Sequence, residues 1–519
     1  MDEAVPGAAR YGSIGIAGRA RGKSVVHASA YANSFGLLIF PDQCGRPRPC
    51  GCRRQGIERR AGAPLTRDDE ANRLSARASR YARLGVNAGA LAARVGVNRL
   101  RGGGRETDAR ALASLLGSMK GPMMKVAQLL STIPDALPAD YANELIRLQS
   151  QAPPMGAGFV RRRMQAELGP GWRERFAEFD LKPAAAASLG QVHRARNLDG
   201  EPLACKLQYP EMASAVETDL SQLDLLFSLH RRIGAAIDTR EIAHEIRERV
   251  REELDYGREA KVADLYGFML ADRPFVRVPR VEKSLSTRRL LTLQWLDGEP
   301  LTAFEKAPQE ARDAIAVGLF DAWWRPFLRY GLIHGDPHLG NYAVVASGED
   351  KARKVEGINL FDYGCVRIFP PRFVRGVVEL YLALKENDDA HIAEAYRKWG
   401  FSKLTRGAFD AMTIWARFIC GPILDDRVRT AADGVKPSEY GRREIGAVMR
   451  ALRAEGGGLV IPREFVFLER ATIGLGGAFL RLGARLNFHR MYEDAIAGFD
   501  EMAVAKRQAE ALAAVGLRT

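Results

Sequence analysis

Apolar and polar positions follow two different periods along this chain, and the change of period marks where its elements lie. Apolar residues recurring every three or four positions predict amphipathic helices at 108–149, 216–233, 242–254 and over most of the chain after 298. Short apolar runs bounded by turn residues predict strands at 184–206, 276–281, 290–295, 342–346 and 355–361. The chain is therefore expected to fold as helices, then a small mixed sheet, then a helical region that contains one hairpin.

The residues best suited to chemistry lie between His334 and Asn341 and at Asp362, which follows the expected hairpin. Phosphoryl transfer needs a carboxylate near the nucleophile, and further oxygen ligands that hold Mg²⁺ against the phosphates. Asp336 and Asn341 have the spacing of a kinase catalytic loop. We therefore expect Asp336 to act as the base or to orient a water molecule, and Asn341 and Asp362 to bind the metal.

A lysine suited to binding phosphates stands upstream of these motifs. Lys206 lies on a predicted strand directly after the turn 197–200, where a kinase places the lysine that reaches the nucleotide. Its carboxylate partner is expected on a helix, and we predict Glu253, at the end of the amphipathic segment 242–254. Surface pairing of this acidic cluster with neighbouring arginines is the alternative interpretation.

The segment before Lys206 differs from the glycine-rich loop of ordinary kinases. Small residues with a Cβ occupy the expected phosphate loop: Ala185, Ala186, Ala187 and Ser188. Each Cβ penalises a positive φ, so this loop cannot wrap the phosphates in the usual way, and we expect an unusual nucleotide preference. Backbone groups around Gln294 and Leu296 are expected to receive the adenine as the hinge between two lobes. No Ala-Pro-Glu segment follows Asp362, which disfavours a protein substrate.

In this order, the motifs resemble the UbiB/AarF/ADCK family of atypical kinases, and the similarity spans residues 112–487. The alanine-rich loop, Lys206, the catalytic loop and Asp362 each match a family motif, and the Glu-x-Asp motif is similar to Glu253-Leu254-Asp255. The family's Lys-x-Gly-Gln motif is similar to Lys125-Val126-Ala127-Gln128, where Ala127 replaces the glycine. The resemblance implies a helical extension over the active site, with Lys125, Gln128 and Asp255 covering the pocket.

The resemblance also implies the fold and the ligands. We expect an α+β, bilobal protein-kinase-like fold, with a small mixed β-sheet N-lobe and a mainly helical C-lobe. The expected divisions are a basic arm (1–105), the helical extension (106–170), the N-lobe (171–297) and the C-lobe (298–519). ATP or ADP with Mg²⁺ is the implied cofactor set. The implied role is in isoprenoid quinone (ubiquinone) or related lipid metabolism, with a lipid or quinone precursor as a further ligand.

Charge narrows the range of partners. Residues 1–105 hold 19 basic and 7 acidic residues, a charge of +12, whereas the whole chain carries +14. The body is nearly neutral, so nucleic acid is not an expected partner, and the arm instead suits contact with an anionic membrane surface. Neither a secretory signal nor a run of 18 apolar residues is evident, which predicts a cytoplasmic protein with peripheral contact to the inner membrane.

Two other functions fit the same motifs. The catalytic loop also suits an aminoglycoside-phosphotransferase-like small-molecule kinase, although the alanine-rich loop, Lys125 and Gln128 argue against it. A nucleotide-gated pseudokinase scaffold would keep the same residues without phosphoryl transfer. The motifs favour nucleotide binding, and they leave the phosphoryl acceptor and the oligomeric state open.

The charge of the arm yields a first prediction. Deleting residues 1–105 is expected to weaken binding to anionic liposomes, because the deletion removes most of the net positive charge. Co-sedimentation with liposomes measures this, and Mg-nucleotide binding by the same variant serves as the control. Liposome binding that survives the deletion would contradict the prediction.

Overall fold

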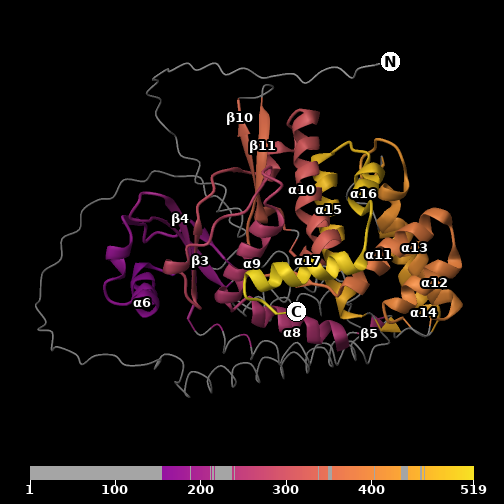
Figure 1. Ribbon diagram of the computed structural model, residues 1–519, viewed down its shortest axis with the longest axis horizontal. Coiled ribbons are helices and arrows are strands. Elements are labelled where there is room, and N and C mark those ends of the chain that lie inside the picture. The colour runs from indigo at the N-terminus through magenta and orange to yellow at the C-terminus, as the bar shows by residue number, and fades with distance from the viewer. Residues whose placement is uncertain are drawn as a thin grey trace, which may run out of the picture.

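The structure is a computed structural model, and its described residues form a sheet-containing lobe followed by a mainly helical lobe (Figure 1). The described residues are 155–187, 189–210, 212, 216, 237–238, 240–336, 338–348, 353–401, 404–433, 442–455, 459–460 and 462–518. The basic arm, most of the expected extension with Lys125 and Gln128, Ser188, and nearly all of the helix expected at 216–233 lie outside them. Among the described residues, no helix combines the length and the apolar character needed to cross a membrane.

A five-stranded sheet forms the first lobe. Its strands are β1 (Glu178–Phe179), β2 (Ala185–Ala186), β3 (Gly190–Arg196), β4 (Pro202–Gln208) and β7 (Leu290–Gln294). The order is β1-β3-β4-β7, β2 pairs with β3, and these pairings are antiparallel. The described strands of this sheet are therefore all antiparallel, unlike the mixed sheet expected of this lobe. The parallel pairing that a mixed sheet requires occurs in the second sheet instead. The strand expected at 290–295 is confirmed.

Strand β4 separates two environments because its side chains alternate between the faces of the sheet. Leu203, Cys205 and Leu207 are fully buried on the outer face, where they pack with residues of α6 (Ala157–Leu168) and with Trp172 in η3 (Trp172–Arg175). Lys206 occupies the opposite face. The apolar outer layer therefore fixes the direction in which the lysine points.

Among the described residues between β4 and β7 are the helices α8 (Arg240–Glu252) and α9 (Tyr256–Met269). The first confirms the amphipathic segment predicted at 242–254. Asp255 caps α9 by accepting a hydrogen bond from the Arg258 backbone N–H at 3.1 Å. This cap starts a new helix, whose inner face packs beside β7.

A second sheet joins the lobes and contains the hairpin. Its order is β6-β11-β10-β8, with strands β6 (Val276–Arg277), β11 (Lys354–Leu360), β10 (Tyr342–Ser347) and β8 (Glu299–Pro300). Strands β6 and β11 are parallel, and β10 and β11 form the predicted hairpin, which pairs Tyr342 with Leu360. A short antiparallel pair, β9 (Leu332–His334) and β12 (Val366–Ile368), brings Val366 opposite His334. The catalytic loop and Asp362 therefore lie between two strand pairs. The remaining pair is β5 (Ile237–Asp238) with β13 (Leu459–Val460).

Helix α10 is the central element of the helical lobe (Figure 1). Ile315, Leu319, Trp323 and Phe327 recur every four residues on its buried face, which packs in the main core. The helix ends at Gly331, whose φ of +67° is a left-handed conformation that favours glycine. The described helices that follow it in the chain are α11 (Pro371–Glu386), α12 (Asp389–Lys398), α13 (Arg406–Leu424), α14 (Arg442–Ala454), α15 (Arg463–Leu482), α16 (Phe488–Ile496) and α17 (Glu501–Ala514).

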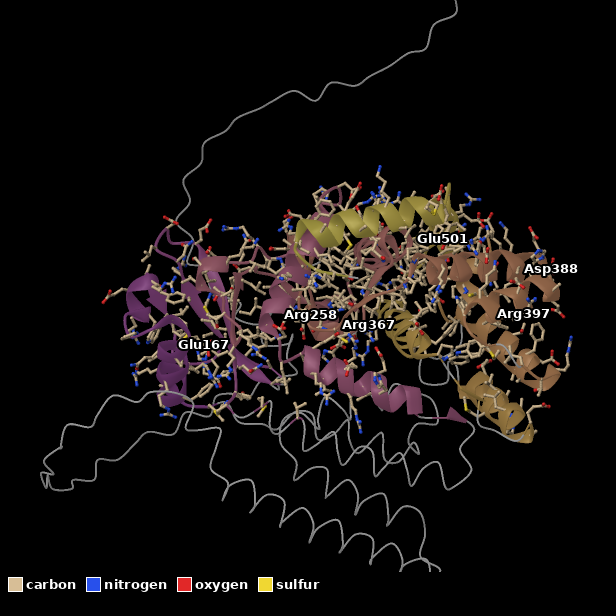
Figure 2. All side chains as sticks on the ribbon, turned by 60° about the horizontal axis from the view of Figure 1, so that its bottom comes forward. Glu167, Arg258, Arg367, Asp388, Arg397 and Glu501 are labelled. Carbon is tan, nitrogen blue, oxygen red and sulfur yellow. The ribbon has the colours of Figure 1, made fainter. Side chains whose placement is uncertain are left out.

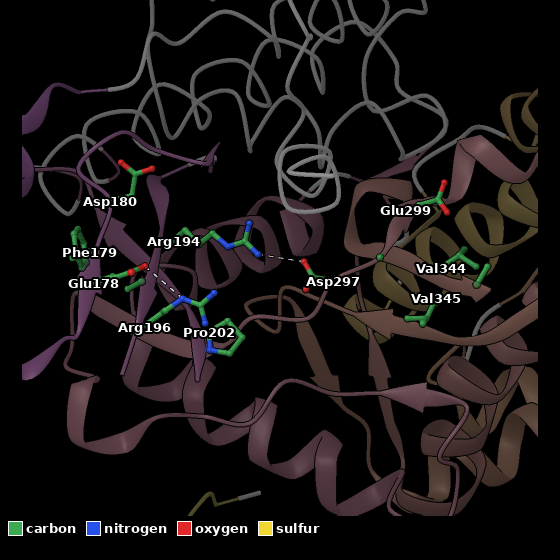
Figure 3. A pocket seen from close by; sticks show the side chains of 13 residues that line it. Glu178, Phe179, Asp180, Arg194, Arg196, Pro202, Asp297, Glu299, Val344 and Val345 are labelled. Atoms are coloured by element: carbon green, nitrogen blue, oxygen red, sulfur yellow. Dashed lines mark hydrogen bonds and ion pairs between the residues drawn. The ribbon is translucent and has the colours of Figure 1, made fainter. Parts of the chain in front are cut away.

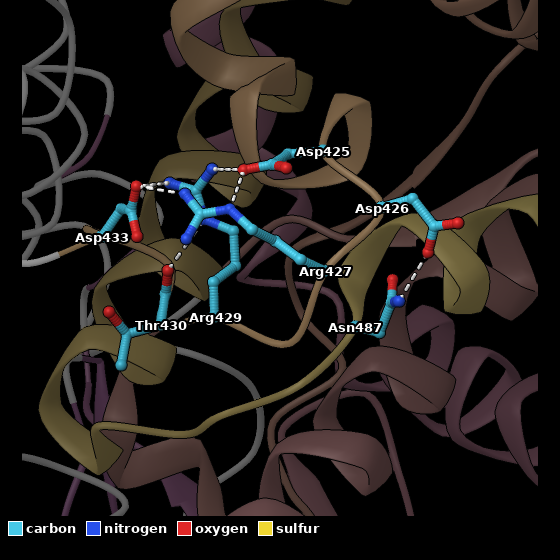
Figure 4. Close-up of polar contacts among 7 residues, drawn as sticks. All are labelled: Asp425, Asp426, Arg427, Arg429, Thr430, Asp433 and Asn487. Carbon is cyan, nitrogen blue, oxygen red and sulfur yellow. Dashed lines mark hydrogen bonds and ion pairs between the residues drawn. The ribbon is translucent and has the colours of Figure 1, made fainter.

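Polar contacts in this lobe hold its connections in place. Ion pairs and hydrogen bonds link the loop after α13 internally and to the start of α16, through Asp425, Asp426, Arg427, Arg429, Thr430, Asp433 and Asn487 (Figure 4). The Arg429 backbone also exchanges hydrogen bonds with Leu486. These contacts explain the loop's conformation, and they lie outside the group of sequence-predicted site residues.

Candidate active site

Lys206 forms a largely buried ionic cluster with two carboxylates. Its Nζ donates to both oxygens of Glu259, at 2.8 and 3.0 Å, and lies 3.5 Å from Asp362 Oδ1. Burial opposes the charge on Lys206, but Asp362 and Glu259 outweigh that effect and hold its pKa above the ordinary value. Burial raises the pKa of Glu259 to about 7, and the charge on Lys206 limits the rise. Strand, helix and hairpin thus meet at one charged group.

The carboxylate paired with Lys206 is Glu259, which corrects the predicted Glu253. Helix α8 ends at Glu252, and the cap at Asp255 starts α9, so Glu253 lies in the turn between the helices. Glu259 lies in the first turn of α9 and is 3% exposed. The sequence signals for this second helix were the capping residue Asp255 and the apolar residues that recur after it. Glu253 is buried beside Gly364, and Asp255, predicted to cover the pocket, serves in the described structure as the helix cap.

Asp362 has a backbone conformation that is rare for a residue with a Cβ. Its φ is +59°, and its Oδ1 accepts a hydrogen bond from the Gly364 N–H at 3.2 Å. His334 Nε2 lies 2.6 Å from the Asp362 carbonyl oxygen and donates to it. The Asp336 backbone nitrogen donates to His334 Nδ1 over 3.4 Å, so Nδ1 carries no proton and Nε2 carries one. One buried imidazole therefore fixes the backbone on both sides of the site.

His334 is suited to this role because it stays neutral. It is fully buried, and it packs against the rings of Tyr266, Trp323 and Tyr363. Burial lowers its pKa, although the nearby Asp336 and Asp362 oppose the shift. A neutral ring can donate with one nitrogen and accept with the other, which a protonated ring cannot do.

Asp336 and Asn341 are held together within the catalytic loop. Both are buried, and Asn341 Nδ2 donates to the Asp336 carbonyl oxygen at 3.2 Å. Because Nδ2 is the donor, the amide offers Oδ1 as an oxygen ligand. The Phe361 N–H donates to the Asn341 carbonyl at 2.8 Å, which joins this loop to the Asp362 segment. The structure thus brings Asp336, Asn341 and Asp362 into one hydrogen-bonded region.

This donor set suits a magnesium ion held jointly with a ligand. Mg²⁺ takes oxygen ligands and is commonly bound by one or two protein groups together with substrate phosphates and waters. Asn341 and Asp362 provide an amide oxygen and a carboxylate. Across the part of the chain that the structure describes, no group of three or more His, Cys, Asp or Glu side chains could enclose a metal by itself. The residues fit an open site completed by phosphates.

A small apolar cluster lies where the two lobes meet. Its buried members come from the alanine-rich loop, both strands after it, the segment after β7 and the hairpin: Ala185, Val192, Ala204, Trp295, Ala343 and Phe361. Leu296 packs beside them. The Gln294 N–H donates to the Arg280 carbonyl at 2.8 Å, so this one donor is engaged within the protein. That backbone groups around Gln294 and Leu296 receive the adenine stays a prediction.

The alanine-rich loop is a tight hairpin rather than an open loop. Ala185 pairs with Val192, and the Ala187 N–H donates to the Gly190 carbonyl at 2.8 Å. Gly190 has to be glycine, because a Cβ there would lie 2.2 Å from the Leu207 carbonyl oxygen. Ala185 and Ala186 thus adopt strand geometry, and the expected effect of this loop on phosphate binding stays a prediction.

A cleft of about 890 Å³ opens beside the hinge, away from the ionic cluster (Figure 3). Its lining includes Arg194, Arg196, Asp297, Glu299 and Val344, and does not include Lys206 or Asp362. The Arg194 guanidinium lies 4.5 Å from the Trp295 ring centroid and 3.5 Å from Asp297 Oδ1. Arg194 therefore connects the wall of this cleft with the apolar cluster.

Ion pairs also tie α8 to the segment after Asp362. Glu245 pairs with Arg367 in β12 and with Arg249 in its own helix, and the Glu245 and Arg367 side chains are both largely buried. Arg258 lies 3.5 Å from Glu252, and this ion pair links the end of α8 to the start of α9. Arg258 and Arg367 appear near each other in the view of Figure 2. The turn that carries Glu253 is therefore anchored to the strand that follows Asp362.

Comparison with known proteins gives consistent matches. Residues 147–396 match the family model for the ABC1 atypical kinase-like domain. The mitochondrial atypical kinase coq-8 of Caenorhabditis elegans is 30% identical over 57% of this chain and 39% of its own length. The mitochondrial atypical kinase COQ8B of Rattus norvegicus is 28% identical over 75% of this chain and 72% of that protein. Matches to several curated relatives span only 37% to 42% of those proteins.

A solved structure shares the fold. The Rv3197–erythromycin complex from Mycobacterium tuberculosis matches with a TM-score of 0.51 and 27% sequence identity, over 76% of this chain and 97% of that one. Together with the family match, this similarity confirms the expected α+β kinase-like fold, with sheets first and a mainly helical region after them.

The ionic cluster leads to a prediction about stability. Lys206→Met is expected to lower the free energy of unfolding by about 3 kcal/mol, because it leaves buried carboxylates without their counter-charge. Adding Glu259→Gln should recover part of this loss, since it removes one of those carboxylates. A double-mutant cycle by urea denaturation measures the coupling, which we expect to exceed about 1 kcal/mol.

The exposed pair between Lys283 and Asp264, which lies on the same helix α9 as Glu259, supplies the matched control. Its cycle should show little coupling because solvent screens the pair. Equal coupling in the two cycles would contradict the assignment of Glu259.

Proposed function

The chain belongs to the ABC1 atypical kinase family, and on this premise we propose that it binds ATP or ADP with Mg²⁺ and catalyses phosphoryl transfer or ATP hydrolysis. The observation that carries the proposal is the ionic cluster of Lys206, Glu259 and Asp362. A largely buried lysine held by two carboxylates near an apolar cluster is suited to receive a phosphorylated ligand with a flat base.

Each residue has a distinct part in the proposed chemistry. Lys206, oriented by Glu259, contacts the α- and β-phosphates, and the apolar cluster around Ala204 holds the adenine. Asn341 and Asp362 hold the metal, which when bound neutralises charge on the transferred group. Asp336 orients the attacking hydroxyl or water molecule and accepts its proton. His334 keeps Asp362 in place through the backbone, so it is a positioning residue.

The acceptor is proposed to be a lipid or a quinone precursor. Two features support this: the resemblance to a family associated with isoprenoid quinone metabolism, and the short connection from Asp362 through β12 into α11, which leaves little platform for a peptide. The basic arm supports peripheral contact with an anionic membrane. These proposals concern the pathway, which the shared fold does not determine.

A small-molecule kinase or binding protein is the second candidate. Two observations favour it: the similarity to a protein solved with erythromycin, and the cleft of about 890 Å³ beside the hinge. A cleft of this size can hold an organic ligand. Phosphorylation of an antibiotic by the purified protein would support this candidate over the lipid-directed one.

The metal site gives a direct prediction. Asp362→Asn is expected to abolish the thermal stabilisation produced by Mg-nucleotide, because the amide neither carries charge for the metal nor pairs with Lys206. A thermal shift assay measures this effect. Asp199→Asn, in the exposed hairpin turn between β3 and β4, is the matched control and should respond like the wild type. An unchanged nucleotide-induced shift in Asp362→Asn would refute the proposed metal ligand.

Turnover requires its own test, because the same residues would serve a pseudokinase. We expect ATP-dependent phosphate release, and a higher rate with anionic liposomes and a phenolic mimic of a quinone head group. Release measured with and without each addition, and with Asp336→Asn as the inactive reference, tests this. Nucleotide binding without release under any of these conditions would favour the pseudokinase scaffold.

A further inference from the structure

Tyr256 lies at the centre of the proposed phosphate site and has no role so far. It is the first residue of α9 and stands three positions before Glu259, so both side chains project from one face of the helix. Its side chain is 1% exposed. The Lys206 Nζ lies 5.1 Å from the centroid of its ring, in a cation–π contact.

The hydroxyl of Tyr256 is located beneath the end of the alanine-rich loop. A Cβ placed on Gly190 would lie 2.9 Å from this oxygen. Gly190 is the first residue of β3 and pairs with Gln208. Two residues further along β3, Val192 pairs with Lys206 on the same face of the sheet. The hydroxyl is therefore between the loop that would cover the phosphates and the lysine that would bind them.

This hydroxyl is buried and has no hydrogen-bond partner among the described residues. A buried polar group without a partner is costly, so native structures satisfy nearly all of them. Burial also raises the pKa of Tyr256 far above its ordinary value, which keeps the group protonated as a donor. Among the described residues, Tyr209, Tyr266 and Tyr396 also carry buried hydroxyls without a partner. Tyr256 differs from them in its contact with Lys206, where a phosphorylated ligand would bring an acceptor.

We propose that the Tyr256 hydroxyl donates a hydrogen bond to a phosphate oxygen of the bound nucleotide and fixes the phosphates against Lys206. The inference rests on the proposed nucleotide-binding function, and it adds a binding residue from the helix side of the site. It also accounts for the glycine at position 190, because a side chain there would fill the space next to the hydroxyl.

Tyr256→Phe tests the proposal because it removes only the oxygen. We expect the Kd for Mg-ATP to rise roughly tenfold, as for loss of one hydrogen bond to a charged group. The affinity for adenosine, which has no phosphate, should not change. Without nucleotide, the variant should unfold at the same temperature as the wild type or higher, because the lost hydroxyl had no partner. Isothermal titration calorimetry and thermal unfolding provide these measurements.

Tyr209→Phe is the matched control. Tyr209 directly follows β4 in the same lobe, and its buried hydroxyl also lacks a partner among the described residues, but it packs by Phe159 on the outer side of the sheet. This variant should bind Mg-ATP like the wild type. The proposal is overturned by an unchanged Kd in Tyr256→Phe, by an equal change in Tyr209→Phe, or by an equal loss of adenosine affinity. Failure of the wild type itself to bind Mg-ATP would instead refute the proposed function.

Discussion

The buried charge of Lys206 is the constraint on which the rest of this structure depends. A charged side chain can leave water only when opposite charges and hydrogen bonds compensate it. Here Glu259 and Asp362 supply that compensation from a helix and from the end of a hairpin. Any arrangement of the two lobes that separated these elements would leave a buried charge without its partner. The cluster therefore selects the relative position of β4, α9 and the segment after β11.

The backbone around Asp362 shows how the fold maintains this arrangement. The left-handed conformation at Asp362 is unfavourable for a residue with a Cβ, and the neutral His334 compensates by holding the carbonyl of that residue. The strand pairs on either side, β10 with β11 and β9 with β12, fix the ends of the segment. Aromatic rings enclose the histidine and keep water away from it. The strain at the metal-binding residue is thus supported by packing on several sides.

The site contains a buried polar group without a hydrogen-bond partner among the described residues, the Tyr256 hydroxyl. Asn341 is oriented by the hydrogen bond that its Nδ2 donates to the Asp336 carbonyl. The apolar cluster between the lobes includes the small side chains of Ala185, Ala204 and Ala343. These features together describe a region prepared for a phosphorylated ligand, and they connect the architecture with the family assignment.

The sequence by itself determined the elements and residues whose signals are local. The helix α8, the strand β7 and the β10–β11 hairpin followed from apolar period and turn residues. The places of Lys206, Asp336, Asn341 and Asp362 followed from spacing, because a catalytic loop and a strand each keep their residues at fixed separations. Only the tertiary structure decided which carboxylate reaches Lys206, since a cap at Asp255 breaks the helix and turns Glu259 inward. It also decided that the Gln294 N–H bonds to the Arg280 carbonyl, and that the Tyr256 hydroxyl is buried with no partner among the described residues. Burial and long-range pairing arise from packing between distant segments, which no local pattern encodes.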